Sequence, residues 1–163
     1  MTVPDYLSYA GQMLRSIQGL CRLALPDKLD WRPCESVMTL GQCMEHTASS
    51  LTPLVEMAVT KHFPPPEFMD VVTQGEHLKN VTAEEAVAIA EKHMARLGDI
   101  LDDVTPERWE NEKVTMPWGF TGSLSMIGVE ALDHASGHRY QLFLYLKLLG
   151  LPLDTGHLYG MHS

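Results

Sequence analysis

The sequence is short of positive charge. Its 163 residues include 12 lysines and arginines against 21 aspartates and glutamates, which gives a formal net charge of −9. Binding to nucleic acids rests largely on lysine and arginine side chains that neutralise phosphates, and anionic membrane surfaces attract the same side chains. The sequence contains no cluster of basic residues that could form such a contact locally. We therefore expect neither nucleic acid nor a membrane to be a partner.

Long apolar runs are also missing. No segment stays apolar over the length that crosses a bilayer. The first apolar stretch is interrupted by Gln12, Arg15 and Gln18, so we do not expect a signal peptide.

Cysteine is scarce and unpatterned. Cys21, Cys34 and Cys43 are odd in number and form no C-x-x-C pair. A disulfide framework or a cysteine zinc site is therefore not expected. Free thiols fit a reducing compartment, and we predict a cytoplasmic location.

Several catalytic motifs are absent as well. Ala135 follows His134, so the H-E-x-x-H helix of zinc proteases is missing, and no histidine has a glutamate three residues before it, as a di-iron carboxylate bundle requires. The sequence has neither a glycine-rich phosphate loop nor a G-x-S-x-G nucleophile elbow. It also shows no alternating strand pattern of useful length, no internal repeat and no low-complexity tract.

What is present is a helical pattern. The length suits one domain over residues 1–163, and an apolar share of 45% is enough for one core. Apolar residues recur at spacings of three and four in four segments, which predicts four amphipathic helices. These run from about Pro4 to Ala24, from Leu40 to before Pro64, from Thr82 to about Val104, and from about Ser123 to Leu149.

Capping residues and prolines mark the ends of these helices. Thr39 with Gln42, and Thr82 with Glu85, have the spacing of capping boxes. Pro53 lies inside the second helix, where a missing backbone donor predicts a kink.

The connections differ in length. Residues 25–37 and the stretch around Trp109 and Trp118 are expected to be loops, and residues 63–81 form the longest irregular link. The fold class is therefore all-α, a four-helix bundle with a long second connection, so its topology need not be plain up-and-down.

The fourth helix carries two histidines one turn apart. Side chains at i and i+4 share a face, so His134 and His138 could share an ion. Both fall in the apolar stripe of this helix, which predicts burial. Buried imidazoles need hydrogen-bond partners or a metal, and the spacing alone leaves both alternatives open.

A metal site needs a third ligand from another helix. His46, near the inner face of the second helix, is the best candidate, and His93, at the edge of the third helix's apolar stripe, is its rival. The remaining histidines are expected to be surface residues: His62, His77, His157 and His162.

Two stretches resemble the DinB-like (damage-inducible protein B) superfamily. Residues 29–33 (LDWRP) and 39–46 (TLGQCMEH) resemble its W-x-P loop followed by a helix that carries one histidine. Residues 132–142 (LDHASGHRYQL) resemble its H-x-x-x-H-R-x-Q-L element, and residues 145–152 continue it. The resemblance spans nearly the whole chain. Tyr140 departs from it, since many members have glycine there, and we expect this to alter packing more than metal binding.

The resemblance implies a four-helix bundle with a three-histidine divalent metal site, formed here by His46, His134 and His138. Zinc, nickel and iron(II) all suit three nitrogen ligands. Members are often dimeric, and we expect a homodimer that uses apolar surface around the last helix, namely Tyr145, Leu146 and Leu148.

Three imidazoles leave coordination positions open for water or a small-molecule substrate. Some relatives are thiol transferases that use bacillithiol or mycothiol, or thiol-dependent isomerases. The leading prediction is therefore a metal-dependent thiol S-transferase that uses a low-molecular-weight thiol. The alternatives are a non-catalytic metal- or ligand-binding protein and a metal-dependent hydrolase. No clear general base stands out, because Glu45, Glu130 and Asp133 are as readily solvated or supporting groups.

Overall fold

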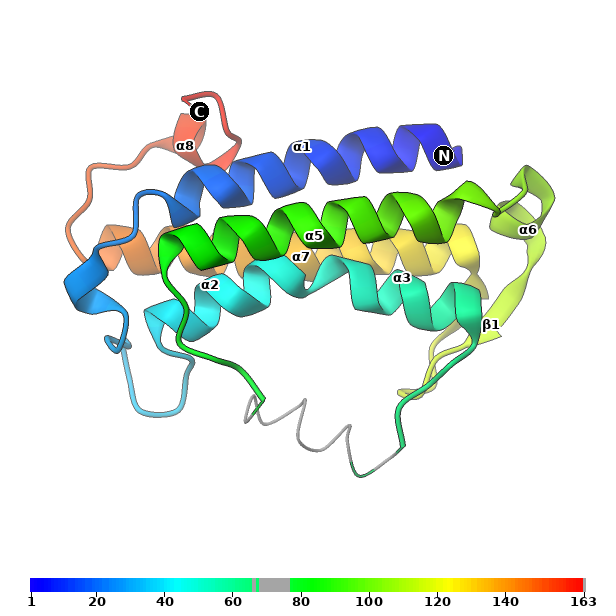
Figure 1. Cartoon of the computed structure of the whole chain (residues 1–163), viewed down its shortest axis with the longest axis horizontal. Coiled ribbons are helices and arrows are strands. Elements are labelled where there is room, and N and C mark those ends of the chain that lie inside the picture. The colour runs from blue at the N-terminus through cyan, green and yellow to red at the C-terminus, as the bar shows by residue number, and fades with distance from the viewer. Residues whose placement is uncertain (66, 68–76, 163) are drawn as a thin grey trace.

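The computed structural model describes residues 1–65, 67 and 77–162, and most of them are helical. Four long helical segments lie side by side as a bundle (Figure 1), which confirms the predicted all-α fold. These segments are α1 (Val3–Cys21), the pair α2 (Leu40–Ser49) and α3 (Leu51–Thr60), α5 (Ala83–Asp102) and α7 (Leu124–Leu148).

Side-chain caps fix where the helices begin. Both predicted capping boxes form, and a third begins α1; the pairs are Thr2 with Asp5, Thr39 with Gln42, and Thr82 with Glu85. Each satisfies two backbone donors that a helix start otherwise leaves without partners. Where the last long helix ends, Gly150 adopts φ +92° just after α7, a conformation that glycine reaches without steric cost.

The directions of the helices explain the long second connection. In Figure 1, α2 and α3 run from left to right, and α5 then starts again at the left. Because these helices are parallel, the chain must return along the bundle between Thr60 and Ala83. The bundle is thus not a plain up-and-down one.

The second helix is interrupted. Ser50 separates α2 from α3, and Pro53 lies in the first turn of α3. Proline has no N–H to donate to the carbonyl four residues earlier, here that of Ser49, so a continuous helix would lose this bond. The kink predicted from Pro53 is confirmed, and its position is the residue Ser50.

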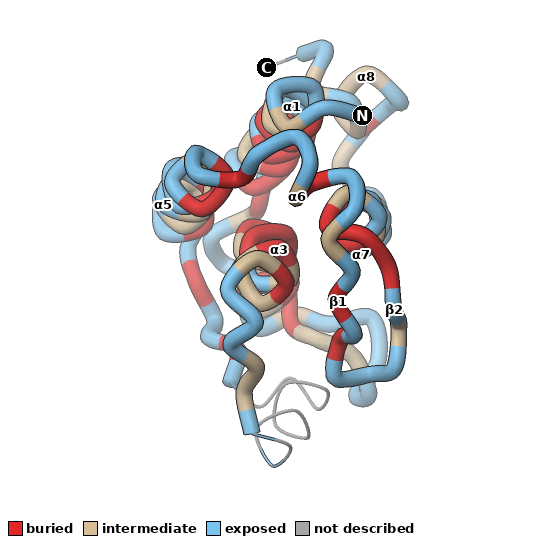
Figure 2. Tube along the Cα trace, turned by 90° about the vertical axis from the view of Figure 1, so that its right-hand side faces the viewer, coloured by how far each residue is buried: buried red, intermediate tan, exposed pale blue. Residues whose placement is uncertain are grey.

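The core runs along the inner faces of the helices, where Figure 2 shows the buried segments. Trp109 belongs to it although its neighbourhood was predicted to be a loop. It lies on the short helix α6 (Pro106–Asn111), is 1% exposed, and packs against Tyr6 with ring centroids 5.2 Å apart. The six-residue helix is too short to show a periodic pattern.

The prediction of helices alone was wrong in one place. Strands β1 (Lys113–Thr115) and β2 (Thr121–Ser123) pair antiparallel before α7, with Val114 opposite Gly122. At three residues each, the strands are too short for alternation to show in the sequence. Figure 2 shows this hairpin beside the start of α7.

Two smaller elements complete the description. A 3₁₀ turn spans Pro26–Lys28, and α8 spans Thr155–Leu158 near the C-terminus. Among residues 1–65, 67 and 77–162, no helix combines the length and the apolar character that crossing a bilayer requires.

Candidate metal centre

Three histidines from two helices meet on one side of the bundle. His46 lies on α2, and His134 and His138 lie one turn apart on α7. One ring nitrogen from each falls within 4.8 Å of the other two. The Nε2 atoms of His46 and His138 are 3.0 Å apart. We call His46, His134 and His138 the histidine triad.

A hydrogen-bond chain sets the tautomer of His138. The Tyr145 hydroxyl donates to the Met38 carbonyl (3.2 Å) and accepts from Nε2 of Gln141 (3.2 Å). That leaves Oε1 of Gln141 facing Nδ1 of His138 at 2.9 Å, where it can only accept a proton. Neutral His138 therefore carries its proton on Nδ1, and its Nε2 lone pair points into the triad, as metal-binding histidines require.

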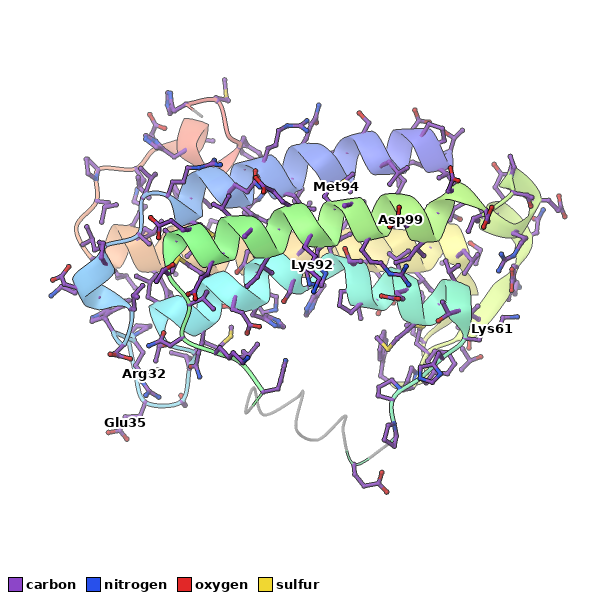
Figure 3. The ribbon with its side chains drawn as sticks, in the orientation of Figure 1. Arg32, Glu35, Lys61, Lys92, Met94 and Asp99 are labelled. Atoms are coloured by element: carbon purple, nitrogen blue, oxygen red, sulfur yellow. The ribbon has the colours of Figure 1, made fainter. Side chains whose placement is uncertain are left out.

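The loop before α2 supports this chain. Trp31 stacks edge-on against Tyr145, with ring centroids 5.7 Å apart, and its carbonyl accepts from Leu40 at the start of α2 (2.8 Å). The loop's outer tip carries Arg32 and Glu35, which point away from the bundle (Figure 3). Tyr145 thus connects the loop that carries the W-x-P motif with the helix that carries His134 and His138.

The surroundings favour neutral imidazoles. Burial, and then repulsion from His138, His134 and His77, lowers the pKa of His46 to about 3. Partial desolvation of the ring, and then repulsion from His138, lowers the pKa of His134 although part of its side chain is exposed, and partial burial lowers the pKa of His138. Neutral imidazole is the form that binds a metal, and each of the three neutral rings has one nitrogen lone pair that it can offer to a cation. The residues present therefore fit a divalent ion.

The predicted burial of the two α7 histidines was wrong. His134 is exposed and His138 is half-buried, whereas Ala135 and Arg139 are buried instead. The buried stripe of α7 passes beside the histidines, through Ala135 and through Arg139, whose guanidinium donates to Ser16 Oγ on α1 (3.2 Å). The triad lies at the rim of the core and is reachable from outside.

A pocket of about 700 Å³ opens beside the triad. His46 and His134 contribute to its wall, and much of the remaining wall is apolar, including Leu54, Met57 and Trp118. The volume is in the range of sites that hold small molecules. A ligand in this pocket would lie next to the triad's nitrogens.

Two polar groups near the triad escaped the prediction. Ser50, at the break between α2 and α3, lines the pocket, and its buried hydroxyl has no hydrogen-bond partner among the described residues. Trp118 also lines the pocket and donates to Oε1 of Glu130 (3.1 Å), whose other oxygen is buried without a partner in the described part of the chain. No sequence signal distinguishes Ser50, whereas the proline three residues later could have indicated a break there.

The other histidines divide into three groups. His93 is half-buried on α5 and is not part of the triad. His62 and His77 are exposed, as predicted, but both line the mouth of the pocket. His162 is exposed, as predicted, and His157 is half-buried; both lie beside Asp154.

Fold and site together define a helical bundle with a three-histidine cluster open to a pocket. A family model described as the DinB superfamily matches residues 12–142, and the chain belongs to this superfamily. The resemblance inferred from the two motifs is thereby confirmed. No curated protein matches the sequence.

Solved structures share the fold. A candidate member of the DinB family from Exiguobacterium sibiricum is 23% identical, with a TM-score of 0.69 over 94% of this chain and 97% of that one. A DinB-like protein from Bacillus cereus is 15% identical, with a TM-score of 0.72 over 94% and 96%. A mycothiol-dependent maleylpyruvate isomerase is 17% identical, with a TM-score of 0.56 over 83% of this chain and 60% of that one.

Proposed function

We propose that the protein binds one divalent metal ion through His46, His134 and His138 and catalyses the transfer of a small thiol to an apolar electrophile. The observation that supports this best is the histidine triad beside a pocket of about 700 Å³, with His46 and His134 in the pocket wall. When bound there, a divalent ion such as zinc, nickel or iron(II) supplies a Lewis acid that lowers the pKa of a thiol or of water.

The chain's own groups would bind and orient the reactants. Leu54, Met57 and Trp118 offer apolar surface to an electrophile. The unpartnered hydroxyl of Ser50 offers a hydrogen bond inside an otherwise largely apolar wall. Gln141 keeps the lone pair of His138 directed at the triad. The positions of the apolar wall, the Ser50 hydroxyl and Gln141 thus support the roles proposed for them.

The thiol would come from a small cofactor, because the protein's cysteines are unsuited to the task. Burial raises the pKa of both Cys21 and Cys43 to about 12, so both remain protonated at neutral pH. Cys34 is exposed on the loop before α2, and the described pocket wall contains no cysteine. A mycothiol-dependent enzyme among the structural neighbours fits the same proposal.

Carboxylates do not favour the hydrolase alternative. Glu56 lines the pocket, but its carboxylate forms an ion pair with Arg96 at 2.5 Å. This carboxylate is therefore not free to act as a general base. We therefore rank thiol transfer above hydrolysis.

The three free thiols also fit the proposed cytoplasmic location.

We further propose a homodimer, with a second copy of the chain packed on the outer face of α7. Tyr145 and Leu146, predicted to be surface for this contact, are instead 3% and 0% exposed, because they pack inside the bundle. Near the end of α7, Tyr140, Leu144 and Leu148 are exposed and lie one turn apart, and Met126 and Val129 are exposed nearer its start.

The first experiment measures metal content by elemental analysis of purified variants. His46→Ala, His134→Ala and His138→Ala should each lose most of the metal from the triad, because two ligands hold such an ion poorly. His93→Ala is the matched control, since His93 is also a half-buried helical histidine. If His93→Ala loses the metal while His46→Ala keeps it, the ligand assignment is wrong.

The second experiment measures thiol conjugation by metal-loaded protein over a panel of apolar electrophiles, with and without a chelator. Activity that the chelator abolishes and His134→Ala lacks would support transfer. Metal binding without conjugation of any electrophile in the panel would favour the non-catalytic binding protein.

A further inference from the structure

A second group of metal-ligating side chains lies near the C-terminus, on the α8 segment. Asp154 caps α8, His157 lies in its first turn, and His162 follows it. Nδ1 of His157 is 2.8 Å from Oδ1 of Asp154, and Nε2 of His162 is 3.1 Å from the same oxygen. One ligand atom from each residue lies within 4.8 Å of the other two. We call these three residues the C-terminal cluster.

The hydrogen bonds within this cluster conflict with one another. The backbone N–H of Asp154 donates to Nδ1 of His157 at 3.2 Å, so this nitrogen presents a lone pair to Asp154. The same nitrogen also faces the Asp154 carboxylate, which can only accept. Two acceptors 2.8 Å apart repel each other unless a cation, either a proton or a metal ion, stands between them.

The spacing suits a metal ion. Bonds of about 2.0–2.2 Å to nitrogen and oxygen place neighbouring ligands about 2.8–3.6 Å apart in octahedral or tetrahedral geometry. The oxygen–nitrogen distances of 2.8, 3.1 and 3.3 Å to Asp154 lie at or close to this range. Two imidazoles with one carboxylate suit borderline ions such as zinc and nickel.

Two glycines in this segment allow the side chains of the C-terminal cluster to approach one another. A Cβ at Gly156 would clash with Nε2 of His162. Gly160 adopts φ +70°, which turns the chain so that His162 returns toward His157, with ring centroids 4.5 Å apart. A side chain at Gly160 would be strained at this φ, and one at Gly156 would displace the imidazole of His162 from its place beside Asp154.

We propose that Asp154, His157 and His162 form a second divalent transition-metal site, separate from the histidine triad, which holds residues 154–162 in the conformation that packs against α1. α8 packs against α1 and α7, Tyr159 lies under the guanidinium of Arg139 at 5.1 Å, and Gly160 approaches Ser16. A metal that joins residues 154 and 162 closes a short loop and so reduces the freedom of this segment to detach.

This site should bind more weakly than the triad. The Asp154 and His162 side chains are 65% and 51% exposed, so water competes for the ion. Arg22 lines the hollow beside His157 and His162, and its positive charge opposes a cation there. We expect one tightly bound ion at the triad and one weaker ion at the C-terminal cluster.

The test is equilibrium dialysis of the full chain, without an affinity tag, against zinc and against nickel. The unchanged protein should bind two ions per chain, and His157→Ala with His162→Ala should bind one, with the weaker affinity lost. His134→Ala with His138→Ala should also bind one, with the weaker affinity kept. His62→Ala, an exposed histidine outside both groups, should still bind two.

Limited proteolysis of the His134→Ala, His138→Ala variant gives a second measurement. Added zinc should slow cleavage within residues 154–163 in this variant, and should not slow it once His157 and His162 are also replaced. Unchanged weak binding and unchanged protection after loss of both tail histidines would overturn the proposal. Because the triad is absent throughout this comparison, the result does not depend on the proposed function.

Discussion

Gln141 shows how one side chain outside a ligand set can control it. Its amide holds Nδ1 of His138 as a donor, so Nε2 keeps a free lone pair. We predict that Gln141→Leu, which has similar volume but no acceptor, weakens zinc binding at the triad about 10–100-fold without unfolding the bundle. Competition against a chromophoric chelator measures the affinity, and circular dichroism checks the fold.

Tyr145→Phe is a milder substitution in the same hydrogen-bond chain. It removes only the hydroxyl that positions Gln141, so the loss of affinity should be smaller. Equal affinities for Gln141→Leu and the unchanged protein would show that the tautomer of His138 does not depend on this hydrogen bond.

At this scale the sequence predicted which three histidines would meet, but not their surroundings. The one-turn spacing of His134 and His138 is visible in the chain, because helix geometry alone brings them together. The Ser50 hydroxyl and the Trp118–Glu130 bond depend on where a helix breaks and where a hairpin folds back, and neither position follows from local periodicity.

Helix α7 carries two glycines in opposite environments. A Cβ at Gly128 would lie 2.8 Å from Cη2 of Trp109 and 3.0 Å from Cε2 of Tyr6, whereas a Cβ at Gly137 would meet no atom within 4 Å. Gly128→Ala should therefore lower the free energy of unfolding by about 1–3 kcal/mol through overpacking. Gly137→Ala should raise it by about 0.5–1 kcal/mol through helix propensity. Urea denaturation measures both, and a loss of stability in Gly137→Ala would contradict this account.

Long elements were predictable and short ones were not. Caps at Thr39 and Thr82 and stripes of ten residues or more predicted the main helices, because such stripes must face a core. The helices α6 and α8 have six and four residues, and each strand of the hairpin has three. Segments this short do not show a recognisable periodic pattern of apolar residues. The hairpin matters nonetheless, since it brings Trp118 to the pocket.

The whole molecule should be sensitive to mild acid when no metal is bound. The native pKa values of His46, His93, His134 and His138 lie below the usual value of 6.5. Between those values and 6.5 the unfolded chain binds more protons than the native one, so stability rises with pH and is lost as pH falls below 6.5. We expect the urea midpoint of metal-free protein to fall from pH 7.5 to pH 5.

Replacing His134 and His138 by glutamine removes two of these four groups, so the fall should be smaller in that variant. The lowered pKa values also mean that protons displace triad-bound metal only at a lower pH than an exposed imidazole would allow. An apo-protein that gains stability on acidification in this range would contradict the assigned direction of the shifts.

Association is the second property of the whole molecule. Tyr140, Leu144 and Leu148 are 56%, 43% and 56% exposed on one face of α7. If a second copy covers this face, the Leu144→Lys, Leu148→Lys variant should be a monomer by light scattering at micromolar concentration, and the unchanged protein a dimer. Tyr9→Lys, which changes a 51% exposed aromatic on α1, is the control and should remain a dimer.

The separation of His46 from His138, 92 positions along the chain, has a consequence for biosynthesis. While the ribosome is still adding α7, the growing chain has His46 but lacks the two ligands that would complete the triad. If the triad holds a metal ion as proposed, the ion can enter it only after the last long helix has been released and has docked, so occupancy of the triad reports a finished fold. Chains stalled before α7 would stay metal-free and could be distinguished from complete ones on that basis alone.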